Sequence, residues 1–131
     1  MSLLRKYMEE VEKDLVVNDF NIKETQLRLP ARKHYWVARL IEAKSELQKL
    51  NDKEKKLQKK LAVKIKEEAP IHLTDKAIST LIDEQDEMFN IKDNKRDLTN
   101  VIEYLEKVEK IMSSMGFDIK NIIELNKLEQ L

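Results

Sequence analysis

Hydrophobic residues recur along most of the chain at intervals of three and four positions, which is the spacing of an amphipathic helix. The first such stretch spans residues 2–16, where Val11 and Leu15 lie on one face. Asn18 and Asp19 follow and supply the side chains that a turn and a helix N-terminus require. The pattern therefore predicts a short first helix, a turn and a second helix.

The second helical pattern runs from Asn21 to Lys66 and is interrupted by Pro30. A proline inside a helix removes one hydrogen bond and clashes with the preceding turn, at a cost of ~3 kcal/mol. We therefore expect either a kink at Pro30 or two helices, with Pro30 in the first turn of the second. Residues 67–73 contain the other proline and form the clearest loop.

Thr74 is expected to cap a third helix, with Leu73 packing on Ile78 as a hydrophobic staple. Asp93 and Asn94 either break this helix or lie within it. The apolar face of the third helix is expected to consist of Ile78, Leu81, Ile82, Met88 and Phe89.

From Leu98 onward the apolar spacing alternates between three and four without a miss. We expect Gly116, the one glycine, to end this helix in a left-handed cap, Phe117 to fold back on it and Asp118 to cap a final helix. That final helix has too little partner surface within one copy, so we expect it to dock on a neighbouring subunit. The predicted oligomerisation residues are Leu98, Val101, Leu105, Val108, Met112, Met115, Phe117 and Ile122.

The composition predicts an all-α fold of long amphipathic helices. One glycine and two prolines in 131 residues are too few for tight hairpins. Seven aromatic residues are few for a compact globule, which favours an elongated subunit with coiled-coil-like packing that completes its core with further copies, although helical heterodimers stay possible. The predicted division is an N-terminal helical region, 1–68, and a C-terminal oligomerisation region, 69–131.

The net charge is zero but unevenly distributed. Residues 44–66 contain nine basic and three acidic residues, whereas residues 67–87 contain one basic and seven acidic residues. The absence of cysteine excludes disulfides and thiolate chemistry. No apolar run approaches the ~18 residues of a membrane span, and the N-terminus lacks the apolar region of a signal peptide. We therefore expect a cytoplasmic protein with no membrane association.

Five lysines of the basic segment share one helical face, spaced four, three, four and four residues apart. We call them the lysine ridge: Lys49, Lys53, Lys56, Lys60 and Lys64. The plain interpretation is a solvated helix flank. Because few acids lie nearby and like charges on a helix repel each other, a polyanion or the acidic segment 67–87 is the expected partner. Lysine suits sequence-independent contacts with phosphate.

A second basic cluster, Arg28, Arg32, Lys33 and Arg39, surrounds Tyr35 and Trp36. Basic residues interleaved with aromatic rings are typical of single-strand binding, because exposed bases stack on the rings. The alternative is that both rings anchor the core.

Catalytic chemistry has almost no support in the sequence. The carboxylates of 83–87 are adjacent helical acids, which usually form a solvated face, and His34 and His72 lie far apart. No phosphate-binding loop, nucleophile or acid–base pair is visible. We expect no enzymatic activity, no cofactor and no metal.

Three segments occur in a particular order: EEVEKDLVVND at 9–19, LQKKL at 57–61 and SSMGFDIKNIIEL at 113–125. The middle segment is a short element in which two leucines enclose basic residues. The last segment contains Ser-x-Gly-Phe-x-Ile-Lys, a turn that enters a final helix. In their order and spacing they resemble the UvsY recombination mediators of T-even-like bacteriophages, over nearly the whole chain.

The resemblance implies a non-catalytic protein that binds single-stranded DNA coated by the phage single-strand-binding protein. It implies that the protein helps a RecA-like phage recombinase to load there, as a ring-like homo-oligomer of six or seven subunits held largely by C-terminal helices. The first basic position of the family's element falls on Gln58 and the second on Lys60. Lys59 is the candidate to replace the charge missing at Gln58.

The leading hypothesis is therefore an oligomeric recombination mediator. The alternative is a coiled-coil structural or adaptor protein that binds no nucleic acid, in which residues 44–66 pair with 67–87 across chains. The predicted DNA-binding residues are Lys49, Lys53, Lys56, Lys59, Lys60, Lys64, Arg32, Lys33, Arg39 and Trp36.

Overall fold

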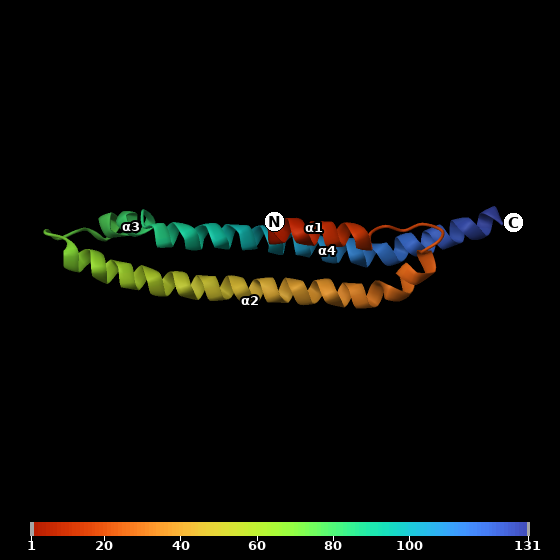
Figure 1. The fold of residues 1–131 in the computed structure, drawn as a ribbon, viewed down its shortest axis with the longest axis horizontal. Coiled ribbons are helices and arrows are strands. Elements are labelled where there is room, and N and C mark those ends of the chain that lie inside the picture. Colours follow the sequence, from red (N-terminus) through yellow and green to blue (C-terminus); the bar gives the residue numbers. More distant parts are fainter. Residues whose placement is uncertain (1, 131) are drawn as a thin grey trace. The chain divides into compact units, whose positions relative to one another are not determined.

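A computed structural model describes residues 2–130 and contains four helices within them (Figure 1). They are α1 (Leu3–Asp14), α2 (Ile22–Glu68), α3 (Asp75–Asp83) and α4 (Asp86–Glu129). No strand occurs in the described part of the chain. The prediction of an all-α fold with few, long elements is confirmed.

The chain divides into two compact units, and α2 and α4 each contribute to both. Unit 1 consists of residues 1–43 with 100–131, and unit 2 consists of residues 44–99. The division differs from the predicted one at residue 68. The division differs because α2 and α4 run in opposite directions within each unit. Each half of α2 therefore packs on a part of α4 that is distant in sequence.

The predicted turn before α2 is present, but Asn18 and Asn21 supply its side-chain hydrogen bonds, whereas the sequence indicated Asn18 and Asp19. Asn18 Oδ1 accepts hydrogen bonds from the backbone N–H groups of Phe20 (2.9 Å) and Asn21 (3.1 Å), and Asn21 Oδ1 accepts from the N–H of Asn18 (2.8 Å). Pro30 lies inside the single helix α2, so the expectation of two helices is wrong. The first turns of α2, orange in Figure 1, depart from the line of the rest of the helix.

The start of α3 also agrees with the sequence. Thr74 Oγ1 accepts a hydrogen bond from the N–H of Ala77 (3.1 Å), and Leu73 packs on the cluster that contains Ile78. The helix ends at Asp83, earlier than its apolar pattern indicates, and Met88 and Phe89 belong to α4. Asp93 and Asn94 lie within α4.

Helix α4 continues through Gly116 to Glu129, so the predicted cap and the separate final helix are both wrong. No glycine or other residue in the described part has a positive φ. A Cβ at Gly116 would meet Leu29 Cδ2 at 3.8 Å, an ordinary contact. Phe117 does not fold back on the helix, because its side chain is 73% exposed. Ile119 is fully buried and holds the continued helix in unit 1.

The apolar stripe of α4 packs within the subunit. This corrects the prediction that the stripe faces a neighbour, because periodicity identifies a buried face without identifying the chain that buries it. Leu98 is half-buried, and Phe117 and Ile122 keep part of their surface in solvent. The residues of the stripe with less than 6% of their surface exposed are Val101, Leu105, Val108, Met112 and Met115.

Candidate nucleic-acid interface

The lysine ridge lies on the part of α2 that belongs to unit 2. All five of its side chains are exposed, while Leu57 is half-buried and Leu61 is 7% exposed. The two leucines pack on the apolar cluster formed with Ile78, Ile82 and Met88. One turn-by-turn pattern therefore serves two purposes: leucines anchor the helix, and lysines face solvent beside them.

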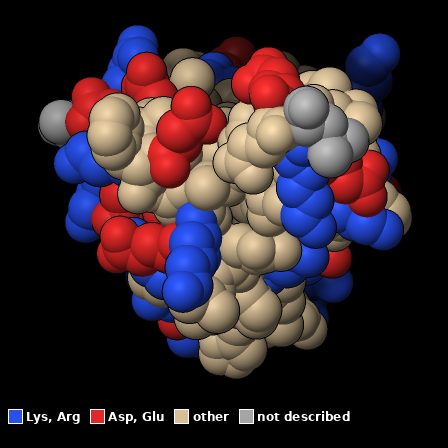
Figure 2. Space-filling model, turned by 90° about the vertical axis from the view of Figure 1, so that its right-hand side faces the viewer, with Lys and Arg blue, Asp and Glu red and all other residues tan. Residues whose placement is uncertain are grey.

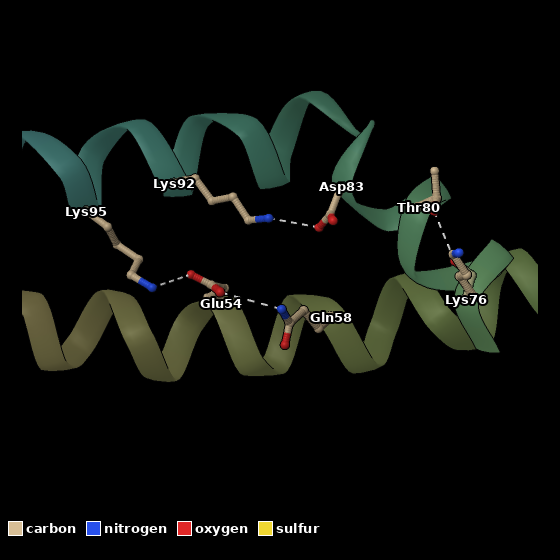
Figure 3. Close-up of polar contacts among 7 residues, drawn as sticks. All are labelled: Glu54, Gln58, Lys76, Thr80, Asp83, Lys92 and Lys95. Atoms are coloured by element: carbon tan, nitrogen blue, oxygen red, sulfur yellow. Dashed lines mark hydrogen bonds and ion pairs between the residues drawn. The ribbon is translucent and has the colours of Figure 1, made fainter.

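The acids nearest the ridge leave most of its charge uncompensated. Lys49 pairs with Glu46 at 3.2 Å, and both side chains are exposed. Glu54 instead accepts from Lys95 of α4, at 2.7 Å, and from Gln58, at 3.5 Å (Figure 3). Within residues 2–130, no ion pair involves the other four ridge lysines, Lys53, Lys56, Lys60 and Lys64.

Three of the ridge lysines line a groove between α2 and α4 within unit 2, which we call the lysine groove. It has a volume of about 380 Å³. Helix α2 provides Lys53, Lys56, Leu57 and Lys60, and α4 provides Glu87, Asn90, Ile91 and Asn94. The ridge therefore forms one wall of a concave site, and an elongated anion could lie along it.

Lys59 lies beside a different groove. Together with Gln58 it faces α3, where the lining includes Asp75 and Asp83. Lys59 therefore does not share the groove of Lys60, although it is the next residue along the chain. The side chain of Gln58 is half-buried and directed to Glu54.

The acidic segment is partly occupied by its own contacts. Asp83 pairs with Lys92 of α4 at 2.8 Å, with both side chains about half exposed (Figure 3). This pair keeps one acid of the segment away from the ridge within the subunit. The residues of the segment that remain exposed with no ion pair in the described part are Glu67, Glu68, Asp75, Glu84, Asp86 and Glu87.

A family model described as "Recombination, repair and ssDNA binding protein UvsY" matches residues 10–130, nearly the whole chain. The chain belongs to the UvsY family. Recombination, repair and binding of single-stranded DNA are the functions of this family as its description states them. Among curated proteins, none matches the chain.

Solved structures agree on the fold. Two crystal forms of the bacteriophage T4 recombination mediator protein UvsY, lattice types IV and II, each superpose with a TM-score of 0.82 at 15% sequence identity. They cover 96% and 100% of this chain, and 98% and 99% of the T4 chains. Lattice type I gives a TM-score of 0.77 at 14% identity, covering 93% of this chain and 97% of that chain.

In this family member, Trp36, which the second basic cluster surrounds, is part of the core of unit 1. Trp36 is 1% exposed, and its Nε1–H donates to Asp14 Oδ2 at 2.8 Å. Tyr7 and Tyr35 both meet its ring edge-to-face, with centroids 5.6 Å and 4.9 Å away. The prediction that Trp36 stacks on a base is wrong for this conformation, because no ring face is open to solvent. The alternative, a core anchor, is correct.

The arginines around Trp36 are also engaged. Arg32 binds Asp14 through Nε (2.9 Å) and a terminal nitrogen (2.8 Å), and its guanidinium lies 4.3 Å from the centroid of the Tyr35 ring. Arg39 also lies over the Tyr35 ring, 4.4 Å from its centroid, and pairs with Glu42 at 2.9 Å. Hydrogen bonding to Tyr35, together with Glu42, raises the pKa of Arg39. These two cations stabilise unit 1.

The surface of unit 1 carries exposed apolar side chains in addition to charge. Figure 2 shows lysine, arginine and acidic side chains interspersed with broad uncharged areas. On α4, Phe117 is 73% exposed, Leu125 58% and Leu128 65%. Spacings of eight and eleven residues place these three on one side of the helix, away from buried Ile119.

Residues 2–130 contain neither a candidate membrane span nor a candidate metal site. No helix there has an apolar stretch long enough to cross a lipid bilayer. No group of three or more acidic or histidine side chains is arranged to hold a metal ion in that part of the chain.

Sequence reasoning missed the α4 wall of the lysine groove. Asn90 and Asn94 are polar residues on a helix, and nothing in the local pattern marks them as different from other solvated positions. Only their placement opposite the ridge distinguishes them.

Proposed function

We propose that this chain is a recombination mediator that binds single-stranded DNA through the lysine ridge. The observation that carries the proposal is the set of four exposed ridge lysines with no ion-pair partner in residues 2–130, three of which line one groove. Phosphates of a DNA strand would occupy the place of the missing counter-charges. Lys33, half-buried on α2, belongs to unit 1 and lies outside the lysine ridge.

The mediator promotes loading of a RecA-like phage recombinase onto DNA coated by the phage single-strand-binding protein, in the cytoplasm of the host. This part rests on membership of the family. The role is non-catalytic: the protein holds the strand and its partners in one assembly. A single subunit offers few lysines, so the mechanism requires several subunits on one strand, where linked sites bind more tightly than separate ones.

We propose a homo-oligomer of six or seven subunits, formed through the C-terminal part of α4. The apolar stripe from Val101 to Met115 already packs within the subunit. The interface would therefore consist of the exposed apolar residues Phe117, Leu125 and Leu128, with half-buried Ile122 beside them. Covering apolar side chains with this exposure by another chain lowers the free energy of the assembly.

The experiment is a fluorescence titration of labelled single-stranded DNA at several salt concentrations. For the wild-type protein, the logarithm of the affinity should fall with the logarithm of the salt concentration, with a slope of about −0.7 for each phosphate neutralised. Lys56→Ala/Lys60→Ala should weaken binding and reduce the slope by about 1.4. The matched control is Lys55→Ala/Lys66→Ala, which removes the same charge from exposed positions of α2 outside the ridge.

Equal losses in the two double variants would contradict the assignment to the ridge and leave only non-specific attraction. A wild-type protein that does not bind DNA would favour the alternative, a helical adaptor that pairs basic and acidic segments of different chains. For the mediator role, recombinase filament assembly on coated DNA should be faster with wild-type protein than with Lys56→Ala/Lys60→Ala.

A further inference from the structure

The lysine groove has a second wall with a different chemistry. Asn90 and Asn94 lie four residues apart on α4, opposite Lys53, Lys56 and Lys60. Both asparagines are exposed, and neither amide has a hydrogen-bond partner in the described part of the chain. One wall of the groove is therefore cationic, and the other ends in unpaired amides.

An asparagine amide offers two donors and one acceptor without a net charge. Such a group matches the edges of nucleobases, which present donors and acceptors side by side. The base of the groove is apolar, since Leu57 and Ile91 line it and Ile91 is 6% exposed. The groove thus combines a wall for phosphate, a wall for base edges and an apolar surface for the flat faces of bases.

Aromatic residues do not supply base contacts in this groove. None of its lining residues is aromatic, and Trp36 is buried in unit 1. In a single strand the bases are not paired, so their edges are free to reach an amide.

We propose that the lysine groove takes single-stranded DNA with its phosphates on Lys53, Lys56 and Lys60 and its bases on Asn90 and Asn94. The inference rests on the proposed DNA-binding function and adds the orientation of the strand and the residues that contact the bases. From Lys53 to Lys60 the helix rises by about 10 Å, so one groove holds only a few nucleotides. Glu87, at one end of the lining, disfavours phosphate there.

The test separates base contacts from phosphate contacts. Binding of wild-type protein and of Asn90→Ala/Asn94→Ala is measured on a labelled oligonucleotide and on an abasic strand of equal length, which keeps the phosphates but lacks bases. Alanine is a better helix former than asparagine, so the variant keeps α4. The control is Asn100→Ala, an exposed asparagine of the same helix outside the groove.

We expect Asn90→Ala/Asn94→Ala to lose about five- to tenfold in affinity for the normal strand, with an unchanged salt slope, because neutral hydrogen bonds release no counterions. On the abasic strand the variant should bind as the wild type does. An unchanged affinity for the normal strand, or an equal loss on both strands, would overturn the inference while DNA binding by the ridge stands. Failure of the wild type to bind either strand would overturn both proposals.

Discussion

Lys95 Nζ lies 2.7 Å from Glu54 Oε2 and so joins α4 to α2 inside unit 2. The side chains are 29% and 16% exposed, which makes the contact partly shielded from water. The pair has a consequence for the proposed DNA-binding surface. Because Glu54 is held by a lysine of α4, it does not compensate the lysines of its own helix.

Replacing Lys95 by methionine should lower the free energy of unfolding by about 1–2 kcal/mol, because the Glu54 carboxylate then lacks its partner in a half-buried position. Urea unfolding measures this change. The double variant Lys95→Met/Glu54→Gln should regain part of the loss. The control is Lys92→Met, whose pair with Asp83 is about half exposed and should contribute less than about 0.5 kcal/mol.

Lys60→Ala should reduce affinity for single-stranded DNA more than Lys59→Ala does. The two residues are adjacent, but Lys60 lines the lysine groove and Lys59 faces Asp75 and Asp83. We expect about a fivefold loss for Lys60→Ala at low salt and less than about twofold for Lys59→Ala. The same titration measures both. Equal losses would mean that Lys59 replaces the charge missing at Gln58.

Glu87→Gln should increase affinity for single-stranded DNA by about two- to threefold at low salt. Glu87 lines the lysine groove, and its carboxylate repels phosphate. The gain should disappear at high salt, since screening weakens exposed charges. Asp86→Asn is the matched control, because it removes the same charge from the first turn of α4 outside the groove. A similar gain in the control would indicate a general effect of net charge.

The interface and the core of α4 should respond differently to a charge. Phe117→Glu/Leu128→Glu should reduce the native mass while the helical circular dichroism is retained, because both side chains are exposed in the subunit. Leu105→Asp should instead abolish the folded state, since a buried charge costs at least about 3 kcal/mol. Light scattering and circular dichroism on the same samples distinguish the two results. An unchanged mass for the double variant would place the interface elsewhere.

Alkaline pH should destabilise unit 1. Burial raises the pKa of Tyr7 and of Tyr104 above the ordinary value of 10.0, and Glu12 adds to the shift at Tyr104. In the unfolded chain these tyrosines ionise near pH 10, while the folded protein keeps them neutral to higher pH. The stability they contribute is therefore complete below pH 10 and falls as the pH rises further.

The variant Tyr7→Phe/Tyr104→Phe should lose less stability than the wild type between about pH 9 and pH 11. Urea unfolding at both pH values measures this loss for each protein. Because the two proteins have the same lysines, the titration of the lysines cancels when the losses are compared. An identical loss in both proteins would contradict this origin of the pH dependence.

The amino-acid sequence by itself determined the features that arise within one turn or one helix. The period of three and four predicts the helices, Thr74 predicts the start of α3, and the spacing of the lysines predicts the ridge. These features depend on neighbours along the chain, so local chemistry is sufficient to define them. Family membership was likewise readable from the order of three segments.

Only the tertiary structure decided which surfaces face each other. A helical stripe records that a face is buried, and the structure shows that the stripe of α4 from Val101 to Met115 is buried within its own subunit. Gly116 suggests a helix end, yet the packing of Ile119 in unit 1 keeps the helix intact beyond it. Trp36 suggests a ring on which a base stacks, but its hydrogen bond to Asp14 of α1 fixes it in the core. Asn90 and Asn94 have a role only because antiparallel packing places them opposite the ridge. Contacts between distant segments depend on three-dimensional packing, which a one-dimensional period does not encode.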